Sequence, residues 1–387
     1  MIKYSHLAKR LKISQTTLRK ILRSLGAVED KKVELGQRTP IITMAMYEWA
    51  ILGLKRASFH VICKNVAQMR AVELFCDAHP YTSYRMRIFG GNPGLYLLFF
   101  TPPEGLRYLE EALTHLQDRG FIDHFVTLVG EPTYDVNTFP DYTAYDPKSG
   151  AWAFDIKDFA VRLNRLGSDS TTAVSPETRS QLSQVEPVDL MILREWTYGA
   201  GPRKQISEIL ANFEKDDLGV YKEELERYTV DRHIISKRIN KINDMGLVRN
   251  YRVWFDQEKV LIFNRTFLWG TADFDFLSKL ARVLKEGRSF PFNSVLAVGP
   301  PDSSNIAQYV WWVELPPKET AALVNWLFEK TMELRTSLVS DRYNDSAVYY
   351  FYHKNFVPNQ SGKGGSWRVS KEYCLDEPLS SVPSMEE

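Results

Sequence analysis

An internal repeat is the feature of this sequence that most constrains its fold. Two stretches of the 387-residue chain show the same order of expected helices and strands. Short matching segments mark the correspondence: residues 100–104 (FTPPE) align with 314–318 (ELPPK), and residues 25–28 (LGAV) align with 245–248 (MGLV). Self-similarity of this kind indicates a duplication, so the chain must build two copies of one structural unit.

The later part of each copy alternates between strand-like and helix-like patterns. In the first copy we expect strands at 57–63, 83–89, 95–101 and 121–129, with helices at 66–78 and 102–116. In the second copy the expected strands are 262–270, 292–298, 307–315 and 337–342, with helices at 274–284 and 318–334. The order βαββαβ is that of a ferredoxin-like domain, so the predicted fold class is α+β.

The earlier part of each copy reads as a group of short helices. In the second copy a strand is expected next, at 248–255, whereas residues 27–55 of the first copy could hold a short wing and a strand or helix. Ser14 is placed to cap the second helix of the first copy, and Gly26 to end it. In the second copy, Thr229 is the expected cap of a helix that Gly246 ends. The pattern predicts a winged helix-turn-helix domain before each βαββαβ domain.

The complete domain prediction has six parts. They are a helix-turn-helix at 1–37, a βαββαβ domain at 38–130, a linker with partial structure at 131–185, a second helix-turn-helix at 186–256, a second βαββαβ domain at 257–357 and a flexible tail at 358–387. The linker and the tail are predicted from their prolines, glycines and hydroxyl-bearing residues.

Charge is balanced over the whole chain but not along it. The chain holds 49 Lys and Arg against 48 Asp and Glu, a formal net charge of +1. Residues 1–32 hold nine basic and two acidic side chains, so 9 − 2 gives +7, and residues 229–252 hold six and two, which gives +4. Basic segments on a neutral protein favour a polyanionic partner.

Several classes of protein are disfavoured by composition. The three cysteines, Cys63, Cys76 and Cys374, form no C-x-x-C pair, which argues against a disulfide framework or a structural zinc site. No apolar run reaches the roughly 18–20 residues that span a bilayer, and residues 1–12 lack a signal-peptide core. We therefore expect a cytoplasmic protein without a membrane segment.

The repeat unit resembles the Lrp/AsnC family of archaeal and bacterial transcription regulators. The resemblance is carried by residues 7–28 (LAKRLKISQTTLRKILRSLGAV), 78–91 (AHPYTSYRMRIFGG) and the following LYLLFFTPPEGLRYLEEAL. It implies tandem winged helix-turn-helix domains, each followed by an ACT-like (RAM) domain, with the two halves pairing internally as a pseudo-dimer. The function it implies is sequence-specific binding of double-stranded DNA, without catalysis.

Two sets of residues carry the DNA-binding prediction. The expected base contacts, at the start of the second helix of each copy, are Gln15, Thr16, Thr17, Lys20, Arg232, His233, Ser236 and Lys237. The expected phosphate contacts, which would release counterions, are Lys9, Arg10, Lys12, Arg19, Arg23, Arg238, Lys241 and Arg249.

The resemblance also implies a small-molecule effector such as an amino acid. Backbone amides at Gly90, Gly91, Gly94 and Gly299 are the expected carboxylate-binding groups, although Gly-Gly-Asn-Pro-Gly is also a common hairpin turn. A homo-oligomer is expected, and no metal or cofactor is predicted.

Two alternatives remain open. Siroheme decarboxylases resemble the same duplicated architecture, with His and Arg acting on a tetrapyrrole; His79, Arg85 and Arg87 would be the nearest candidates. The second alternative is a scaffold without DNA binding, in which aromatic clusters such as residues 309–312 and 349–352 form an interface.

Overall fold

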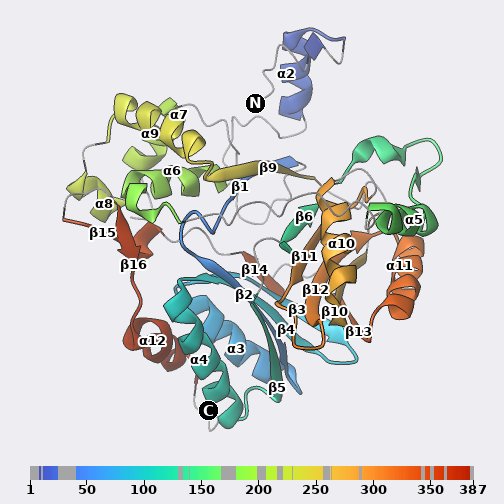
Figure 1. The fold of residues 1–387 in the computed structure, drawn as a ribbon. Helices are drawn as coiled ribbons and strands as arrows, with labels where there is room; N and C mark the ends of the chain where they lie inside the picture. The colour runs from blue at the N-terminus through green and yellow to red at the C-terminus, as the bar shows by residue number, and fades with distance from the viewer. Residues whose placement is uncertain are drawn as a thin grey trace. The chain divides into compact units, whose positions relative to one another are not determined.

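The computed structural model describes most of the chain (Figure 1). The described residues are 8–9, 12–24, 41–129, 134–138, 140–166, 180–197, 206–215, 221–228, 230–255, 262, 264–286, 290–340, 345–348, 353–360 and 364–383. The fold class is α+β, as predicted. The chain divides into two compact units, each assembled from three separate stretches rather than from consecutive domains.

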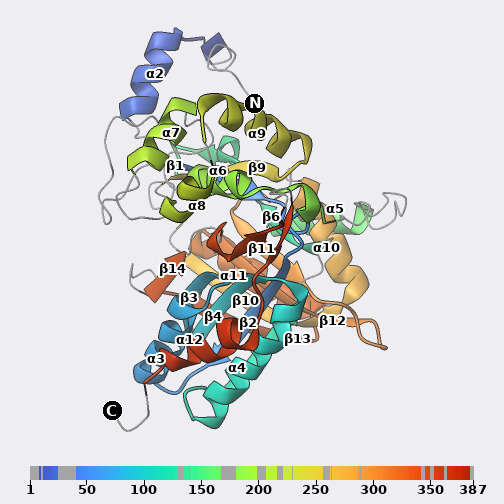
Figure 2. The ribbon, with the colours of Figure 1, turned by 90° about the vertical axis from the view of Figure 1, so that its left-hand side faces the viewer.

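Unit 2 holds both βαββαβ repeats and consists of Trp49–Leu182, Glu258–Val357 and Ser366–Glu387. The first repeat has six elements: β2 (Lys55–Ile62), α3 (Val66–Ala78), β3 (Thr82–Gly90), β4 (Gly94–Thr101), α4 (Leu106–Asp118) and β5 (His124–Val129). Its strands lie in the order β5-β2-β4-β3. Helices α3 and α4 lie against one face of these strands (Figure 2).

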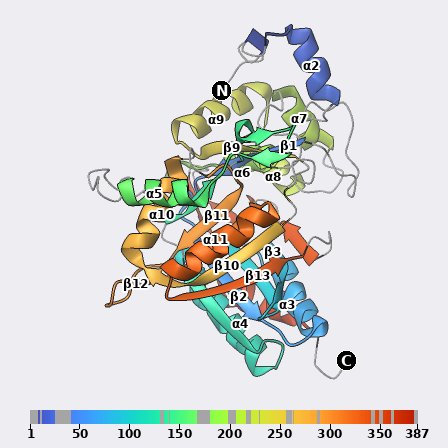
Figure 3. The same ribbon diagram turned by 90° about the vertical axis from the view of Figure 1, so that its right-hand side faces the viewer.

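The second repeat follows the same plan. Its elements are β10 (Asn264–Asp273), α10 (Phe274–Glu286), β11 (Ser294–Val298), β12 (Ile306–Leu315), α11 (Pro317–Lys330) and β13 (Glu333–Val339). The strand order is β13-β10-β12-β11, which is equivalent to that of the first repeat. Helices α10 and α11 cover its outer face (Figure 3). A short antiparallel pairing of β3 with β13 joins the repeats into one ten-stranded sheet.

Three apolar cores stabilise unit 2. One lies between the first repeat's strands and helices around Phe59, Phe75 and Phe99, and a second lies in the equivalent place in the second repeat. The third core joins side chains of both repeats, including Met86, Tyr96, Phe267 and Trp269. The strands therefore bury both faces: the helices cover one, and the other packs against the second repeat.

The segment predicted as a linker adds structure to unit 2. It contains β6 (Val136–Thr138), β7 (Tyr145–Asp146), β8 (Ala151–Trp152) and α5 (Ile156–Leu166). Strand β6 pairs with β11 at the end of the large sheet, and Trp152 and Phe159 are buried in the second repeat's core. The partial structure predicted for this segment thus consists of short elements between its prolines, and their aromatic side chains are buried.

The predicted flexible tail is also ordered where the structure describes it. Residues 364–383 include β16 (Gly365–Trp367), a π-helical turn (Glu372–Asp376) and α12 (Glu377–Ser380). Leu375 and Val382 are buried in the first repeat's core, and the Trp367 indole donates a hydrogen bond to the Leu52 carbonyl. Scattered apolar side chains anchor this segment despite its glycines and prolines.

Unit 1 consists of Met1–Glu48, Ser183–Gln257 and Pro358–Gly365. Its described elements are α2 (Gln15–Ser24), β1 (Ile41–Tyr47), α6 (Pro187–Thr197), α7 (Ile206–Lys215), α8 (Lys222–Arg227), α9 (Arg232–Asp244) and β9 (Val248–Phe255). Strand β1 pairs with β9 along its length, so the strands that follow the two helical segments form one shared ribbon rather than two separate wings. Tandem winged helix-turn-helix domains are thus not confirmed.

The helix boundaries in unit 1 follow local capping. Ser14 accepts a hydrogen bond from the Thr17 amide at 2.9 Å, so its predicted capping role is confirmed. Thr229 lies outside the described residues; the cap of α9 is Asp231, which accepts from the Ile234 amide at 2.7 Å. Gly246 follows α9 with a φ of +66°, the left-handed conformation that ends helices, as predicted. In the described part of the chain, no helix has the length and apolarity needed to cross a membrane.

Candidate functional site

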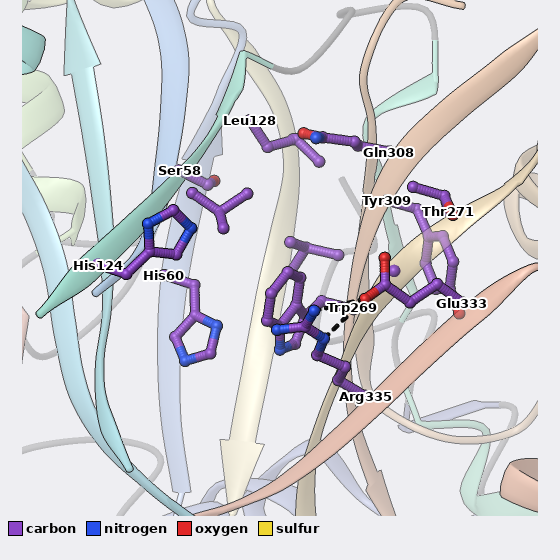
Figure 4. A pocket seen from close by; sticks show the side chains of 13 residues that line it. Ser58, His60, His124, Leu128, Trp269, Thr271, Gln308, Tyr309, Glu333 and Arg335 are labelled. Carbon is purple, nitrogen blue, oxygen red and sulfur yellow. Dashed lines mark hydrogen bonds and ion pairs between the residues drawn. The ribbon is translucent and has the colours of Figure 1, made fainter. Parts of the chain in front are cut away.

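Unit 2 contains a cavity of about 160 Å³ between strands of the two repeats (Figure 4). The strands that supply its walls are β2 and β5 of the first repeat and β10, β12 and β13 of the second. Its lining residues are Ser58, His60, His124, Val126, Leu128, Trp269, Gly270, Thr271, Gln308, Tyr309, Val310, Glu333 and Arg335. A dry cavity of about 150 Å³ holds a benzene molecule, so this one accommodates a small ligand or one arm of a larger ligand.

Alternation along β2 explains why polar groups reach the cavity. Successive side chains of a strand point to opposite faces, so Phe59 and Val61 enter the core under the helices while Ser58 and His60 face the second repeat. Cys63 lies in the helix-side core, on the face opposite to that of His60. The chemistry of the cavity is thus set by alternate residues of an otherwise apolar strand.

His60 is the most unusual side chain of the cavity. It is 3% exposed, and neither ring nitrogen has a partner at normal hydrogen-bond geometry among the described residues, although the Asn92 main chain lies near enough to act on the ring. Its ring meets that of Trp269 edge to face at 4.7 Å between centroids. Burial lowers the pKa of His60 to about 4; the Asn92 main chain opposes this shift, while Arg335 and His124 add to it. His60 is therefore neutral near pH 7, with one donor and one acceptor nitrogen.

Arg335 lies across the cavity from His60 (Figure 4). Its guanidinium carbon lies 4.6 Å from the centre of the Trp269 ring, a cation–π distance. Glu333 accepts from Arg335 Nε at 2.8 Å and lies 2.6 Å from Nη2. The guanidinium has five N–H donors, so this one carboxylate leaves donors of Arg335 for another partner.

Hydrogen-bond donors predominate around the cavity. The Trp269 indole N–H and the His60 ring nitrogens are buried and without partners in the described structure. The Tyr309 side chain lies in the helix-side core of the second repeat instead. Glu333 is the one carboxylate among the lining residues, and Arg335 already binds it. A donor-rich cavity next to a guanidinium suits a ligand that brings acceptors, above all a carboxylate.

The duplication places different chemistry at equivalent positions of the two repeats. On β2 and β5, His60 is paired with Val126 and Ile62 with His124; on β10 and β13, Trp269 is paired with Arg335 and Thr271 with Glu333. His60 thus corresponds to Trp269, and His124 corresponds to Glu333. The first repeat supplies imidazoles, and the second supplies the ion pair and the aromatic surface. Among the described residues, no cluster of His, Cys, Asp or Glu could hold a metal ion.

None of the predicted DNA-contacting residues lines the cavity. On α2 and just before it, the described side chains Lys9, Lys12, Gln15, Thr16, Thr17 and Lys20 are exposed; Arg10 and the side chains of Arg19 and Arg23 lie outside the described structure. On α9 and β9, Arg232, His233, Lys237 and Arg249 are exposed, and Ser236 and Lys241 are half-buried.

Arg238 contradicts its predicted role. It is 6% exposed and bonded to Asp189 and Glu186, so its charge stabilises the packing of α6 against α9 and is not available to a phosphate.

The predicted effector glycines serve the fold instead. A Cβ on Gly94 would lie 1.8 Å from the Val61 carbonyl oxygen, so glycine permits a close approach of β4 to β2. The Gly299 amide already donates to the Gln308 carbonyl at 2.9 Å and cannot be presented to a carboxylate. Gly90 pairs with Ser337 between β3 and β13, and Gly91 lies in the exposed turn. None of the four lines the cavity.

The residues predicted for a tetrapyrrole enzyme are also structural. His79 ends α3, and its Nδ1 accepts from the Tyr81 amide at 3.1 Å; burial lowers its pKa to about 3. Arg85 and Arg87 pair with the buried Glu73, and also with Asp77 and Asp345. The histidine and arginine that share a cavity are instead His60 and Arg335. The sequence holds one signal for His60: when the two repeats are aligned, a histidine in the first stands where the second has Trp269.

Comparisons with known proteins were made for the whole chain. No protein-family model and no curated protein matches it. Among solved structures, the siroheme decarboxylase NirDL aligns over 91% of this chain and 90% of its own, with 13% sequence identity and a TM-score of 0.47. The same enzyme in co-complex with an iron-uroporphyrin III analogue aligns over the same shares, with 13% identity and a TM-score of 0.48.

These findings contradict the prediction of an Lrp/AsnC-type regulator that binds DNA and performs no catalysis. The solved structures with which the chain aligns are those of an enzyme, and the ligand named for one of them is a tetrapyrrole rather than DNA. No transcription-regulator family model matches. The basic segments that suggested DNA binding lie in unit 1, whereas the cavity with chemically poised groups lies in unit 2.

Proposed function

We propose that unit 2 is an enzyme that binds a carboxylate-bearing small molecule in the cavity between its two repeats and uses His60 for proton transfer. The observation that carries this proposal is the buried His60 ring, without a partner at normal hydrogen-bond geometry in the described structure, opposite Arg335 across a donor-rich cavity. Perturbed titratable groups that converge on a cavity are typical of catalytic sites.

In this proposal Arg335 binds the carboxylate of the ligand. Its free N–H groups can form charge-assisted hydrogen bonds with that carboxylate. The Trp269 ring holds the guanidinium in place from one side, and Glu333 holds it through Nε. Both contacts orient the donors of Arg335 before the ligand arrives, which reduces the entropic cost of binding.

His60 would respond to the charge of the bound ligand. A negative charge within about 4–6 Å favours the imidazolium form, so carboxylate binding raises the pKa of His60 from its low value toward neutrality. His60 then holds a proton only when the cavity is filled. The imidazolium ion thus forms only beside the bound molecule, to which it can donate its proton.

Decarboxylation is a reaction that this arrangement suits. When the bond between the carboxylate and its neighbouring carbon breaks, CO2 leaves and the electron pair stays on that carbon. The carbon then takes the proton from His60, which returns to its neutral form, so that R–CH2–COO⁻ and H⁺ give R–CH3 and CO2. The apolar side chains Val126, Leu128 and Val310 limit access of water to the reacting carbon.

We propose a carboxylated tetrapyrrole as the substrate class. With a volume of about 160 Å³, close to that of a cavity that holds benzene, the cavity is too small for a macrocycle but large enough for one carboxylate-bearing arm of it. Siroheme and iron-uroporphyrin III carry several such arms on one ring, so they are the compounds to test first.

The test is to incubate the protein with siroheme or iron-uroporphyrin III and measure the product mass and CO2 release. We expect His60→Gln to bind the tetrapyrrole but to lose turnover by about 10²–10⁴-fold, the usual contribution of acid–base catalysis. Arg335→Gln should mainly weaken binding. His115→Gln, which changes an exposed histidine on α4, serves as the matched control and should behave as the unmodified protein.

Two results would contradict the proposal. One is that addition of the protein changes the absorbance spectrum of neither tetrapyrrole. The other is that His60→Gln turns over substrate as fast as His115→Gln.

For unit 1 we propose that α6, α7 and α9 form one packed helical group. Asp189 of α6 and Arg238 of α9 support this reading, since their buried ion pair fixes the two helices together.

A further inference from the structure

A chain of buried polar groups leads from the edge of unit 2 to the cavity wall. Asp135 pairs with Arg56 Nη1, and Arg56 Nη2 donates to the Tyr96 hydroxyl at 3.3 Å. The Tyr96 hydroxyl lies 3.0 Å from Ser58 Oγ, and Ser58 lines the cavity. Arg56, Ser58 and Tyr96 are 8%, 1% and 4% exposed. The cavity mechanism described above uses none of these four residues.

The direction of the hydrogen bonds in this chain follows from the donors available. Arg56 carries only donors, so the Tyr96 oxygen must accept from it. The single proton of Tyr96 then has Ser58 Oγ as its acceptor, since no other partner of that hydroxyl is found in the described structure. Ser58 accepts this proton, which leaves its own proton free to be donated into the cavity.

The guanidinium of Arg56 polarises the whole chain. A hydroxyl that accepts from a charged donor becomes a stronger donor itself, and successive hydrogen bonds strengthen one another in a low-dielectric interior. The positive charge of Arg56 is held in place by Asp135, whose side chain is 18% exposed. The result is a serine hydroxyl that faces the cavity as a donor, with a buried cation behind it.

We propose that Ser58 is a second carboxylate-binding donor of this cavity and that Tyr96 and Arg56 are positioning residues that orient and polarise it. The inference rests on the proposed function, because it assigns a further contact to the same carboxylate-bearing ligand. The cavity would therefore prefer anionic ligands. An anionic ligand gains binding free energy from both Arg335 and Ser58, whereas a neutral ligand of the same shape gains less from each contact.

Benzoate and benzamide are suitable probes because they match in shape and differ in charge. Their affinities for the full-length protein can be measured by calorimetric titration. We expect the unmodified protein to bind benzoate more tightly than benzamide. Ser58→Ala should weaken benzoate binding by about tenfold, the worth of one charge-assisted hydrogen bond, with little change for benzamide.

Tyr96→Phe tests the polarisation, since it removes the hydroxyl without touching the cavity wall. We expect benzoate affinity to fall by about threefold to tenfold, with benzamide affinity unchanged. The double variant of Ser58 and Tyr96 should lose no more than Ser58→Ala alone, because both changes interrupt one chain. Tyr108→Phe is the matched control: it removes another arginine-bonded tyrosine hydroxyl, on a half-buried side chain of α4 outside the cavity lining.

The outcomes separate this inference from the proposed function. If the unmodified protein binds neither probe, the anion-binding cavity itself is wrong and the inference falls with it. If benzoate binds but Ser58→Ala and Tyr96→Phe leave its affinity unchanged, the donor chain alone is overturned. Equal losses for benzoate and benzamide in Tyr96→Phe would show a structural role for Tyr96 and would also overturn the inference.

Discussion

At the scale of single residues, burial determines the chemistry of His60 and His79. Both are almost completely buried in unit 2, and burial lowers the pKa of each, to about 4 and about 3. His79 is held between Phe75 and Phe99 and satisfies one nitrogen through the Tyr81 amide. His60 borders a cavity and has no such partner among the described residues. The same physical effect thus produces one structural histidine and one that is available to a ligand.

This burial predicts a loss of stability in acid. Between the ordinary histidine pKa of 6.5 and the lowered native values, the unfolded chain binds more protons than the native protein, so the free energy of unfolding rises with pH. We expect each histidine to contribute about 2–3 kcal/mol that is present above pH 6.5 and is lost as the pH falls toward 4. Urea unfolding at a series of pH values measures this. In His79→Gln the free energy of unfolding should depend less steeply on pH. If it depends on pH as steeply as in the unmodified protein, His79 is not a source of the acid sensitivity.

Arg238 gives a second prediction at this scale. Its removal leaves the buried Asp189 without its partner, so Arg238→Ala should lower the free energy of unfolding by about 3–5 kcal/mol. Lys237→Ala is the matched control, because the neighbouring side chain is exposed and should change stability by less than about 0.5 kcal/mol. Similar stabilities of the two variants in denaturant titrations would show that the ion pair is not structural.

Residue roles were the part of the site that the sequence predicted least well. One amino-acid sequence predicts that His60 lies on a strand, but it does not predict that Arg335 of the other repeat faces His60. That information depends on the packing of two sheet faces, which leaves no local pattern. The basic character of residues 1–32 and 229–252 was easier to read and led to the wrong partner.

At the scale of elements, the pairing of β10 with β13 builds half of the cavity. Trp269 lies opposite Arg335 and Thr271 opposite Glu333, so one register sets both the cation–π contact and the ion pair. Gly270, between them, allows the two strands to approach, since a Cβ there would lie 1.8 Å from the Glu333 carbonyl oxygen.

We therefore expect Gly270→Ala to displace β13 and to lower the free energy of unfolding by about 3 kcal/mol. Carboxylate binding should weaken at the same time, because Glu333 and Arg335 move with the strand. Gly91→Ala is the control: its Cβ meets nothing within 4 Å, so stability and binding should be unchanged. If calorimetry shows that Gly270→Ala is as stable as Gly91→Ala, the close approach of these strands is not essential.

Much of the element order could be predicted, because helix and strand periodicities are local. The helix expected at 66–78 is α3 itself, and the strands of both repeats lie within a few residues of their predicted positions. The exceptions are segments whose stability comes from distant contacts. Strand β6 exists because β11 pairs with it, and the last helical turns exist because Leu375 and Val382 fit the first repeat's core.

At the scale of the whole molecule, the duplication gives one chain two halves of a single sheet, and the inner faces of these halves pack together. A single repeat would leave that apolar face open, whereas the joined repeats bury it in a shared core. The two copies then diverged where they meet, with imidazoles from one side and an arginine–glutamate pair from the other. The sequence repeat predicted the joining of the halves, but not that a cavity with unequal walls would lie between them.

The C-terminal segment of unit 2 provides a test at this scale. Truncation after Gly365 removes Trp367, Leu375 and Val382, each buried, and should cost about 2 kcal/mol for each of these side chains. A marked fall in the melting temperature is expected. Truncation after Pro383 is the control and should leave it unchanged. Equal melting temperatures would mean that this segment does not stabilise the fold.

The central claim is that the cavity receives a carboxylate beside His60, and an NMR titration of the His60 ring measures this most directly. We expect a His60 pKa of about 4 in the free protein and a clearly higher pKa in saturating benzoate, with no such rise in Arg335→Gln at the same benzoate concentration. A His60 pKa near 6.5 that does not respond to benzoate would contradict the account.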